Sequence, residues 1–342
     1  MRAVIIKKHG DVDELISADV QKPKISNEEA LVQVKACALN HLDIWTRQGM
    51  PGVHIPMPHI LGCDIAGEVA EIKSSASKIK EGTKVIVSPG ISCGRCEFCS
   101  MGWDSLCDQY QILGFQVDGG YAEFVKVPAR NLIPVSNRYS FEEWVACPLV
   151  YVTAWHMLVT RAELKEGETV LIHAAGSGVG SAAIQVAKMK GAKVITTIGS
   201  PTKEKKAKEL GADHIINYKT HDFAEEVKKL TNGKGVQVVF EHIGTETFTK
   251  SLACLSKKGR LVTCGTTSGG TAQIDIRFLF VRQHSLLGSY MGGKFELDEV
   301  VKHLESGKLK PVIDTIFPLE QARNAHQQML DRKNFGKIVL KI

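Results

Sequence analysis

The chain has 342 residues, 44% hydrophobic and 23% charged, which is an ordinary composition for a folded globular protein. One hydrophobic core rarely serves this length, so two domains are expected. The net charge of +6 comes from scattered lysines, and no basic stretch interleaved with aromatic residues indicates nucleic-acid binding. No apolar run reaches the roughly 18 residues of a membrane span. Residues 1–10 lack a signal-peptide core, so we expect a cytoplasmic protein without a membrane partner.

The first part of the chain, residues 1–150, predicts a small β-rich domain with long loops. Short β-like runs such as EALVQVKACAL and YAEFVKVP are separated by turns rich in Gly and Pro. Residues 291–342 form a short α+β segment. Because this segment is too small to fold alone, we expect it to pack on the first domain.

Residues 151–290 alternate between apolar strands and amphipathic helices. The predicted strands are ETVLIHAAG, AKVITTIG, DHIINY, VQVVFEHIG, GRLVTCG and HSLLGSYMG. Such alternation is typical of an α/β domain with a parallel sheet and right-handed crossovers. Gly191, Gly211, Gly233 and Gly259 stand where the intervening helices are expected to end.

The segment HAAGSGVGS joins the first of these strands to a helix. Small residues at Ala175, Ser177 and Gly180 allow a tight turn, close to which a pyrophosphate can sit at the positive helix N-terminus. The spacing G-x-G-x-x-G is not met, because Ala175 and Ser177 replace the first two glycines. An ordinary strand-to-helix turn is the alternative, but the six alternating elements favour a dinucleotide site.

The end of the second strand predicts which dinucleotide is bound. An NAD site usually has an Asp or Glu there, to accept from the ribose hydroxyls. This strand ends in TTIGSPTKEKK, with no acid before Glu204. Ser200 and Lys203 are instead placed to meet a 2′-phosphate. The residues therefore favour NADP(H), with NAD(H) as the alternative, unless the lysines are only a solvated helix face.

The loop SCGRCEFCSMGWDSLC carries Cys93, Cys96, Cys99 and Cys107. Four thiolates on one compact loop suit a tetrahedral zinc ion. An iron–sulfur cluster is less favoured, because its usual run places the fourth Cys after three residues and follows it with Pro. Four protein ligands leave no open position, so this zinc is predicted to be structural.

With these motifs, the chain resembles the medium-chain dehydrogenase/reductase superfamily of zinc alcohol dehydrogenases and quinone oxidoreductases. The resemblance covers nearly the whole length and rests on the order of GISCGRCEFC, GGYAEFVKVP, VTAWHML, AAGSGVG, ELGADHIINY and FGKIVLKI. It implies a GroES-like catalytic domain (1–150 and 291–342, zinc lobe about 90–110), a Rossmann domain (151–290), and an active-site cleft between them. It also implies dimers or tetramers, for which residues 274–290 are the expected subunit contact.

Zinc alcohol dehydrogenases of this family hold a second, catalytic zinc, and here the matching positions depart from the pattern. Asn40 replaces the first ligand, a cysteine, and Cys63 stands where a histidine is usual. Leu149 occupies the third position, with Cys147 two residues away. These departures from the family pattern favour an enzyme that holds no catalytic zinc.

The segment ALNHLDIW, which contains Asp43, is similar instead to zinc-free quinone and enone reductases. These enzymes transfer hydride to an activated alkene, and a side-chain amide can stabilise the enolate that forms. Asn40 is the first candidate donor, with turn capping as its alternative role. Trp45 is expected to wall the pocket, while Tyr151 or Tyr290 supplies a proton unless it only packs.

The resemblance and the turn together assign several further residues. Cys63 is included among the catalytic candidates, although a small buried apolar residue is its alternative role. The cofactor-binding candidates are Thr153, Ser177, Gly178, Val179, Gly180, Ser200, Lys203, Tyr218, Gly265 and Lys337.

Two other functions stay open at this point. A zinc-type alcohol dehydrogenase could use an unorthodox site built from Cys63, Asp64, His41, Cys37 and Cys147. A dinucleotide-binding protein without useful catalysis is the other alternative. The leading hypothesis is an NADP(H)-dependent oxidoreductase that reduces an activated C=C bond in a small-molecule substrate, such as a quinone, an enone or an enoyl thioester like acrylyl-CoA.

Overall fold

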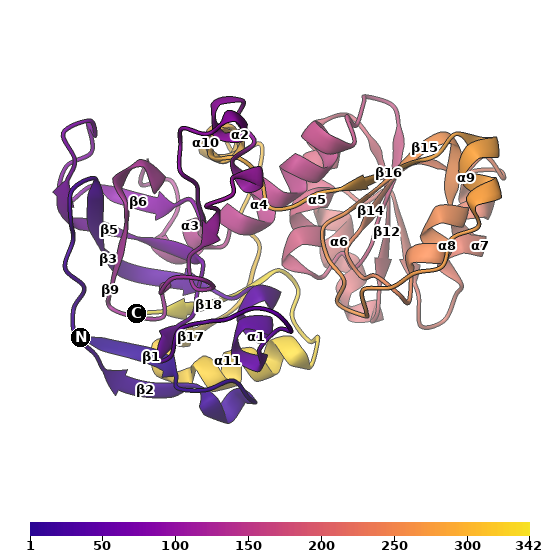
Figure 1. Cartoon of the computed structure of the whole chain (residues 1–342). Helices are drawn as coiled ribbons and strands as arrows, with labels where there is room; N and C mark the ends of the chain where they lie inside the picture. The colour runs from indigo at the N-terminus through magenta and orange to yellow at the C-terminus, as the bar shows by residue number, and fades with distance from the viewer. The chain divides into compact units, whose positions relative to one another are not determined.

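The computed structural model describes residues 1–342 (Figure 1). Contacts divide the chain into two compact units. The first unit contains Met1–Leu149 and Gly293–Ile342, and the second contains Val150–Gly292. None of the helices combines the length and the apolar character needed to cross a membrane.

The first unit is rich in β-strands, which pair antiparallel except for the two C-terminal strands, which are parallel to each other. A three-stranded sheet has the order β2 (Ile16–Asp19), β1 (Arg2–Ile6), β4 (His59–Ile60). The large sheet has the order β10 (Leu132–Pro134), β6 (Lys84–Val87), β5 (Asp64–Lys73), β3 (Glu29–Ala38), β18 (Lys337–Lys341), β17 (Ile313–Pro318), and β9 (Phe124–Pro128) also pairs with β3. A short ribbon joins β7 (Gly90–Ile91) to β8 (Gln111–Ile112).

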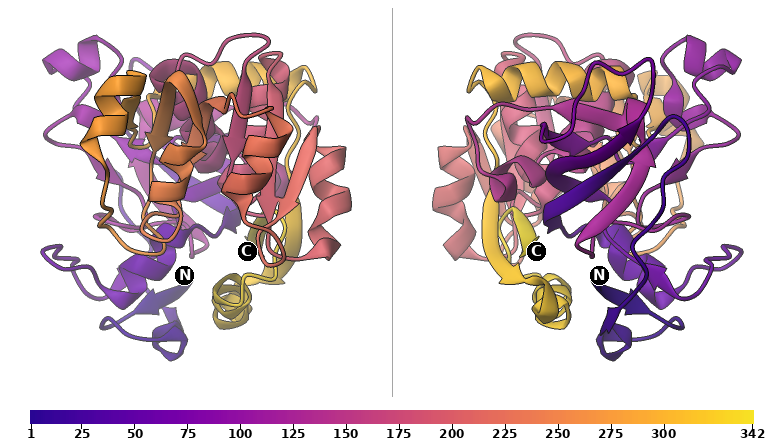
Figure 2. Two further views of the ribbon diagram at one scale, coloured as in Figure 1. Left: turned by 90° about the vertical axis from the view of Figure 1, so that its right-hand side faces the viewer. Right: turned by 90° about the vertical axis from the view of Figure 1, so that its left-hand side faces the viewer.

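The C-terminal strand β18 lies inside the large sheet, between β3 and β17. Its Val339 pairs with Ala38 of β3, and Ala38 pairs on its other side with Asp64 of β5. Figures 1 and 2 show the yellow C-terminal strands beside the darker strands of this unit. The C-terminal segment therefore lies against the β-rich part of this unit, which brings residues near 337 next to residues near 40.

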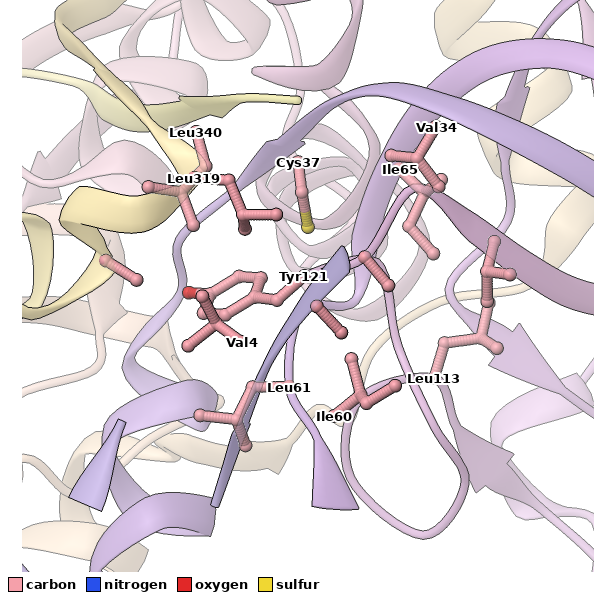
Figure 3. Packing of buried hydrophobic residues seen from close by; sticks show 14 of the residues in the cluster. Val4, Val34, Cys37, Ile60, Leu61, Ile65, Leu113, Tyr121, Leu319 and Leu340 are labelled. Atoms are coloured by element: carbon pink, nitrogen blue, oxygen red, sulfur yellow. The ribbon is translucent and has the colours of Figure 1, made fainter. Parts of the chain in front are cut away.

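The core of the first unit draws its residues from both larger sheets and from the C-terminal helix α11 (Ala322–Leu330). Figure 3 shows Tyr121 in this core, beside Val4 and Leu61. The Tyr121 hydroxyl is 3.1 Å from His326 Nε2. The tyrosine therefore buries its ring and still has a hydrogen-bonding partner for its polar end.

Short helices connect these strands. They are η1 (Val12–Glu14), α1 (His41–Gln48), α2 (Glu97–Ser100), η2 (Asp104–Leu106), η3 (Ala129–Asn131), α3 (Phe141–Val145), α10 (Lys294–Glu305) and η6 (Leu319–Gln321), while α4 (Pro148–Trp155) runs from the first unit into the second.

The second unit contains one six-stranded sheet in which every pair is parallel. Its order is β13 (His214–Asn217), β12 (Lys193–Ile198), β11 (Thr169–Ile172), β14 (Val236–Glu241), β15 (Leu255–Thr263), β16 (Ser285–Gly288). The order reverses between β11 and β14, and ligands of such sheets bind at the carboxyl ends of the strands beside this reversal. The predicted α/β fold class is confirmed.

Crossover helices connect the strands of this sheet. They are α5 (Gly178–Met189), η5 (Pro201–Lys203), α6 (Glu204–Glu209), α7 (Phe223–Leu230), α8 (Phe248–Ala253) and α9 (Ile276–Arg282), while η4 (His156–Arg161, a π-helix) precedes β11. Gly191, Gly211 and Gly233 follow α5, α6 and α7 with positive φ, as expected. The expected helix end at Gly259 is wrong, because α8 ends at Ala253 and Gly259 lies within β15.

Candidate functional site

The predicted metal ligands lie together on one lobe of the first unit. Short segments hold the four cysteines: Cys93 follows β7, Cys96 and Cys99 border and enter α2, and Cys107 follows η2. Their sulfur atoms all lie within 4.8 Å of one another. The Asp104 carboxylate accepts from the Lys294 backbone N–H at 2.9 Å and so ties the lobe to α10.

The geometry of this cluster fits a zinc ion. A tetrahedral site with Zn–S bonds of about 2.3 Å needs sulfur atoms about 3.8 Å apart. Cys99 Sγ lies 3.4 Å from Cys96 Sγ and 3.9 Å from Cys93 Sγ. Backbone N–H groups of Cys96 and Arg95 point at Cys93 Sγ at 3.3 and 3.5 Å, and such donors stabilise a thiolate. The four thiolates would hold a structural zinc.

A second cluster forms where β3, β5 and β18 lie side by side. Strand β18 pairs antiparallel with the end of β3, Val339 with Ala38, and this brings Lys337 to Asn40, the residue that precedes α1. Asp64 begins β5 and pairs with Ala38. Three distant parts of the sequence thus bring an amide, a carboxylate and an ammonium group into one buried place.

Hydrogen bonds join these three side chains. Lys337 Nζ lies 2.6 Å from Asn40 Oδ1, 2.6 Å from the Leu39 carbonyl and 2.8 Å from Asp64 Oδ2. Asn40 Nδ2 donates to Asp64 Oδ2 at 2.8 Å, and the Leu149 N–H donates to Asp64 Oδ1 at 2.8 Å. The side chains of Lys337 and Asp64 are only 4% and 0% exposed. All three donors of the ammonium therefore have acceptors, as a buried charge requires.

Cys63 and Asp43 border this network. Asn40 Nδ2 approaches Cys63 Sγ at 3.2 Å and the Ala38 carbonyl at 3.4 Å. Burial, and then the nearby Asp64 and Asp43 carboxylates, raise the pKa of the Cys63 thiol well above its usual value.

Asp43 fixes the backbone on both sides of this network. Its carboxylate accepts from the Asn40 N–H at 2.6 Å and from the Gly62 N–H at 3.0 Å. It therefore holds the start of α1 to the segment before β5. Burial raises its pKa to about 7, although these two N–H groups and Lys337 act in the opposite direction.

The aromatic candidates have different surroundings. Trp45 of α1 is half-buried and makes an edge contact with His41, with ring centroids 5.7 Å apart. In the second unit Tyr151 is buried, and its hydroxyl accepts from Gln185 Nε2 of α5 at 2.6 Å. Tyr290, which follows β16, is 49% exposed. The catalytic roles assigned to these residues stay predictions.

The predicted dinucleotide turn joins β11 to α5 in the second unit. Ser177 caps α5, and its hydroxyl accepts from the Gly180 N–H at 2.9 Å and donates to the Ala174 carbonyl at 2.8 Å. A Cβ atom at position 180 would collide with the Ala174 carbonyl oxygen. Gly180 is therefore needed for the close packing of helix on strand, and Gly178 and Val179 form the first helical turn beside it.

The end of β12 brings together two residues assigned to the cofactor. Ser200 caps η5, in which Lys203 is the last residue. A Cβ atom at Gly199 would collide with the Tyr218 hydroxyl, so this tyrosine lies against the strand end next to Ser200. Glu204 already belongs to α6. No acidic side chain therefore stands at the end of β12 itself.

The other cofactor candidates are spread over both units. Thr153 is buried in α4, and Gly265 follows β15 beside the His242 carbonyl. Lys337, assigned to cofactor binding, lies in the buried network with Asp64 described above.

Sequence reasoning missed two features of these sites. One is the pairing of Lys337 with Asp64, which depends on strand register. The other is Glu241, a fully buried carboxylate at the end of β14 that contacts His173, the residue before the dinucleotide turn. The available signal was an acidic residue ending the apolar strand VQVVFE beside the turn.

Comparisons with known proteins agree with this architecture. Residues 26–137 match the alcohol dehydrogenase GroES-like domain, and residues 178–306 match the zinc-binding dehydrogenase family. An NAD-dependent alcohol dehydrogenase of Sulfolobus acidocaldarius is 34% identical over the full length of both chains. An acryloyl-coenzyme A reductase of Metallosphaera sedula is 31% identical over 99% of each. A crystal structure of an NAD-dependent alcohol dehydrogenase is 43% identical, with a TM-score of 0.96 and both chains covered in full.

A GroES-like domain, a Rossmann-type sheet and a four-cysteine lobe define the class of two-domain NAD(P)-dependent oxidoreductases. The chain belongs to the medium-chain dehydrogenase/reductase superfamily, as the resemblance implied. It is an enzyme that takes a nicotinamide dinucleotide and acts on a small-molecule substrate, and its cysteine lobe fits zinc. The alternative of a non-catalytic dinucleotide-binding protein is therefore set aside.

Proposed function

We propose that this enzyme reduces activated C=C bonds in quinones, enones or enoyl thioesters with NADPH. The observation that carries the proposal is the network of Asn40, Asp64 and Lys337. At the three positions where relatives are expected to ligate a catalytic zinc, the chain has an amide, Asn40, a protonated thiol, Cys63, and an apolar side chain, Leu149. The neighbouring Asp64 carboxylate is already bound to the Lys337 ammonium group and to Asn40. Such a set favours chemistry that needs no Lewis acid.

When bound, NADPH would supply a hydride for the β-carbon of the alkene, and negative charge would develop on the carbonyl oxygen. A proton from Tyr151, Tyr290 or water would then complete the reduction at the α-carbon. Asn40 is the assigned donor to that oxygen. Its Nδ2 donates to the charged Asp64 at 2.8 Å, whereas its other two neighbours are poor acceptors: the Cys63 thiol, a weak acceptor, at 3.2 Å and the Ala38 carbonyl at a long 3.4 Å. The second amide hydrogen is therefore weakly held and can turn to substrate. Lys337 polarises the amide by binding Asn40 Oδ1, which strengthens it as a donor.

A substrate panel tests the reaction. Purified enzyme with NADPH should reduce quinones, enones or acryloyl-CoA, and should oxidise primary and secondary alcohols slowly or not at all. Asn40→Ala should lower kcat on the preferred substrate by about 10²-fold, the usual effect of losing one such donor. Its affinity for dinucleotide should match that of the wild type, because the turn at Ser177 lies in the other unit. Alcohol oxidation with no alkene reduction would refute the proposal.

A zinc-dependent alcohol dehydrogenase is the second candidate. It is favoured by the names of the Sulfolobus relative and of the crystal structure with 43% identity. It would use Cys63 and Asp64 with neighbours such as Cys37, Cys147 or His41. Two zinc ions per chain, together with alcohol oxidation that a chelator abolishes, would support this candidate over alkene reduction.

We propose NADP(H) as the preferred cofactor. Ser200, Lys203 and Tyr218 surround the end of β12, where no carboxylate is available to accept from ribose hydroxyls. Lys203→Ala should raise the KM for NADPH about tenfold and leave the KM for NADH unchanged, since only NADPH carries the 2′-phosphate. Lys205→Ala, an exposed neighbour in α6, is the matched control. A wild-type preference for NADH, as two relatives' names suggest, would refute the assignment.

We also propose a homodimer that forms through the edge of the second unit. Strand β16 is the last strand of its sheet and leaves one side unpaired. Large apolar side chains are exposed on α9 and β16, namely Ile276, Phe278, Phe280, Val281 and Leu286. Pairing of two β16 edges around a two-fold axis would cover them. Val281→Asp should then produce monomers in sedimentation, whereas a monomeric wild type would contradict the proposal. Location in the cytoplasm stays a prediction from sequence.

A further inference from the structure

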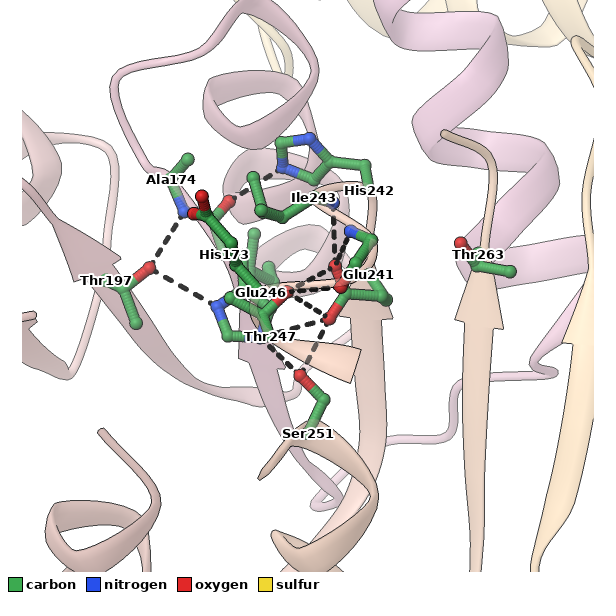
Figure 4. Close-up of polar contacts among 12 residues, drawn as sticks. His173, Ala174, Thr197, Glu241, His242, Ile243, Glu246, Thr247, Ser251 and Thr263 are labelled. Atoms are coloured by element: carbon green, nitrogen blue, oxygen red, sulfur yellow. Dashed lines mark hydrogen bonds and ion pairs between the residues drawn. The ribbon is translucent and has the colours of Figure 1, made fainter. Parts of the chain in front are cut away.

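Glu241 lies at the centre of a buried polar cluster that the proposed chemistry does not use (Figure 4). Its carboxylate, at the end of β14, is fully buried. It accepts from the backbone N–H groups of Ile243 and Gly244 at 2.7 and 3.2 Å, from Thr247 Oγ1 at 3.0 Å and from Ser251 Oγ at 2.7 Å. So many donors hold the carboxylate in its charged form without a lysine or arginine partner.

His173, the first residue after β11, continues the cluster toward the dinucleotide turn. Its Nε2 is 2.8 Å from Ser251 Oγ and 3.5 Å from Glu241 Oε2. Since the only hydroxyl hydrogen of Ser251 is given to Glu241, Ser251 must accept from His173, and the histidine proton is therefore on Nε2. Burial lowers the pKa of His173 to about 4, so the ring is neutral and Nδ1 carries no proton at neutral pH.

Thr197, in β12, completes the connection. His173 Nδ1 can only accept, so the Thr197 hydroxyl donates to it across 3.5 Å, while Thr197 Oγ1 accepts from the Ala174 N–H at 2.9 Å. The His173 ring therefore donates from Nε2 to Ser251 and accepts at Nδ1 from Thr197. These hydrogen bonds link a buried charge at β14 to a backbone group at the start of the turn, and Figure 4 shows this path from Ser251 to Ala174.

Ala174 is the residue around which the turn is built. It has φ of +52°, a left-handed conformation that a residue other than glycine adopts at some cost. Its carbonyl accepts from the Ser177 N–H at 2.9 Å and from the Ser177 hydroxyl, and it also limits position 180 to glycine. Its N–H bond to Thr197 therefore helps to keep a strained residue, and with it the N-terminus of α5, in place.

We propose that His173 is a positioning residue for the dinucleotide turn, acting between Glu241 and Thr197 to hold Ala174 in its left-handed conformation. The inference rests on the proposed binding of the cofactor pyrophosphate at Ser177–Gly180. Because the cluster does not include the end of β12 at Ser200, its loss should weaken NADPH and NADH alike. Because it touches no reacting atom, its loss should leave turnover at saturating cofactor nearly unchanged.

Dinucleotide affinity and steady-state kinetics of full-length variants test the proposal. His173→Phe and Thr197→Val should each raise the Kd and KM for NADPH about tenfold, the effect expected from losing one buried hydrogen bond, with kcat within twofold of wild type. The double variant should be little worse than either single variant, because both break the same path. His284→Phe is the matched control, since His284 Nε2 bonds only a backbone carbonyl, that of Ser256, at 3.0 Å.

The outcomes distinguish failure of the role of His173 from failure of the proposed dinucleotide site. Wild-type affinity in both Thr197→Val and His173→Phe would overturn the role of His173 while leaving the dinucleotide site intact. Failure of the wild type to bind either dinucleotide would instead overturn the proposed site. If His173→Phe does not fold, the smaller His173→Leu decides, because it also removes both ring nitrogens. Thr197→Val cannot replace it, since it removes the acceptor of the Ala174 N–H directly. A fall in kcat with unchanged KM would also count against a positioning role.

Discussion

Lys337 is the residue on which the buried network of the first unit depends. Its ammonium neutralises Asp64 and also binds Asn40, and neither charged side chain reaches water. Removal of one partner of a buried ion pair leaves the other charge uncompensated, which typically costs 3–5 kcal/mol. The network is therefore a structural requirement as well as a candidate catalytic feature.

We predict that Lys337→Met lowers the free energy of unfolding of the first unit by about 3–5 kcal/mol. The matched control is Lys341→Met in the same strand, because Lys341 is 67% exposed and pairs with Glu142 at the surface. The control should lose less than about 1 kcal/mol. Urea unfolding of both variants measures the difference. Equal losses would show that burial of the Lys337–Asp64 pair carries no special cost.

Residue-scale features were predictable only where they depend on local sequence. The four ligands of the lobe, and Ser177 and Gly180 at the turn, stand close together in the chain, and their spacing indicates their arrangement. Lys337 and Asp64 are brought together by the register of two strands on β3, which no local pattern encodes. Sequence reasoning named Lys337 from family resemblance alone, without its partner.

The zinc lobe, residues 93–107, is a group of short elements whose expected role is to hold a structural zinc ion. It is held by η2, α2 and the short ribbon of β7 and β8, and these elements are too small to keep one conformation without cross-linking. The zinc ion would replace the missing hydrophobic core of the lobe.

We predict one zinc per wild-type chain and none in Cys96→Ser, measured by elemental mass spectrometry on protein purified without chelator. Loss of zinc should make residues 93–107 sensitive to protease while dinucleotide binding persists, because the turn at Ser177 is in the other unit. Cys254→Ser, which changes a buried cysteine outside the lobe, should retain one zinc. Retention of the metal by Cys96→Ser would contradict the assignment of the ligands.

Local sequence patterns predict the helices and strands better than they predict where each one begins and ends. The parallel sheet was predictable, because each strand is a short apolar run followed by an amphipathic helix. Gly259 is the expected end of the helix that follows VQVVFEHIG, yet the chain leaves α8 at Ala253 and enters β15 at Leu255. Pairing of β15 with β14 and β16 decides this boundary, and those partners lie far away in sequence.

At the scale of the whole molecule, buried histidines make stability depend on pH. Burial lowers the pKa of His173 to about 4, and burial together with Arg47 lowers that of His326 to about 3. The unfolded chain therefore binds more protons than the folded chain below about pH 6.5, and stability falls as the pH falls from there toward 4. Asp43 acts in the opposite direction. Its pKa is raised to about 7, so its contribution to the free energy of unfolding is lost as the pH rises toward 7.

We predict that His326→Gln is less sensitive to acid than the wild type. The wild type should lose on the order of 3 kcal/mol more than the variant between pH 7 and pH 4, since protonation of the unfolded histidine is absent in the variant. Glutamine can still bond the Tyr121 hydroxyl, so the packing change is small. Urea midpoints at several pH values measure the effect, and parallel curves for the two proteins would contradict it.

The position of β18 has a consequence for how the protein is made. This strand occupies an interior position of the first unit's sheet, yet it is translated after the whole of the second unit. Domains generally fold as they leave the ribosome, N-terminal first. Here the second unit can complete its sheet early, whereas the first must wait with β3 unpaired on one side at Ala36–Ala38 and Asp64 lacking its lysine. During that interval the nascent chain exposes an open strand edge, and chaperones that recognise such edges would find their target there.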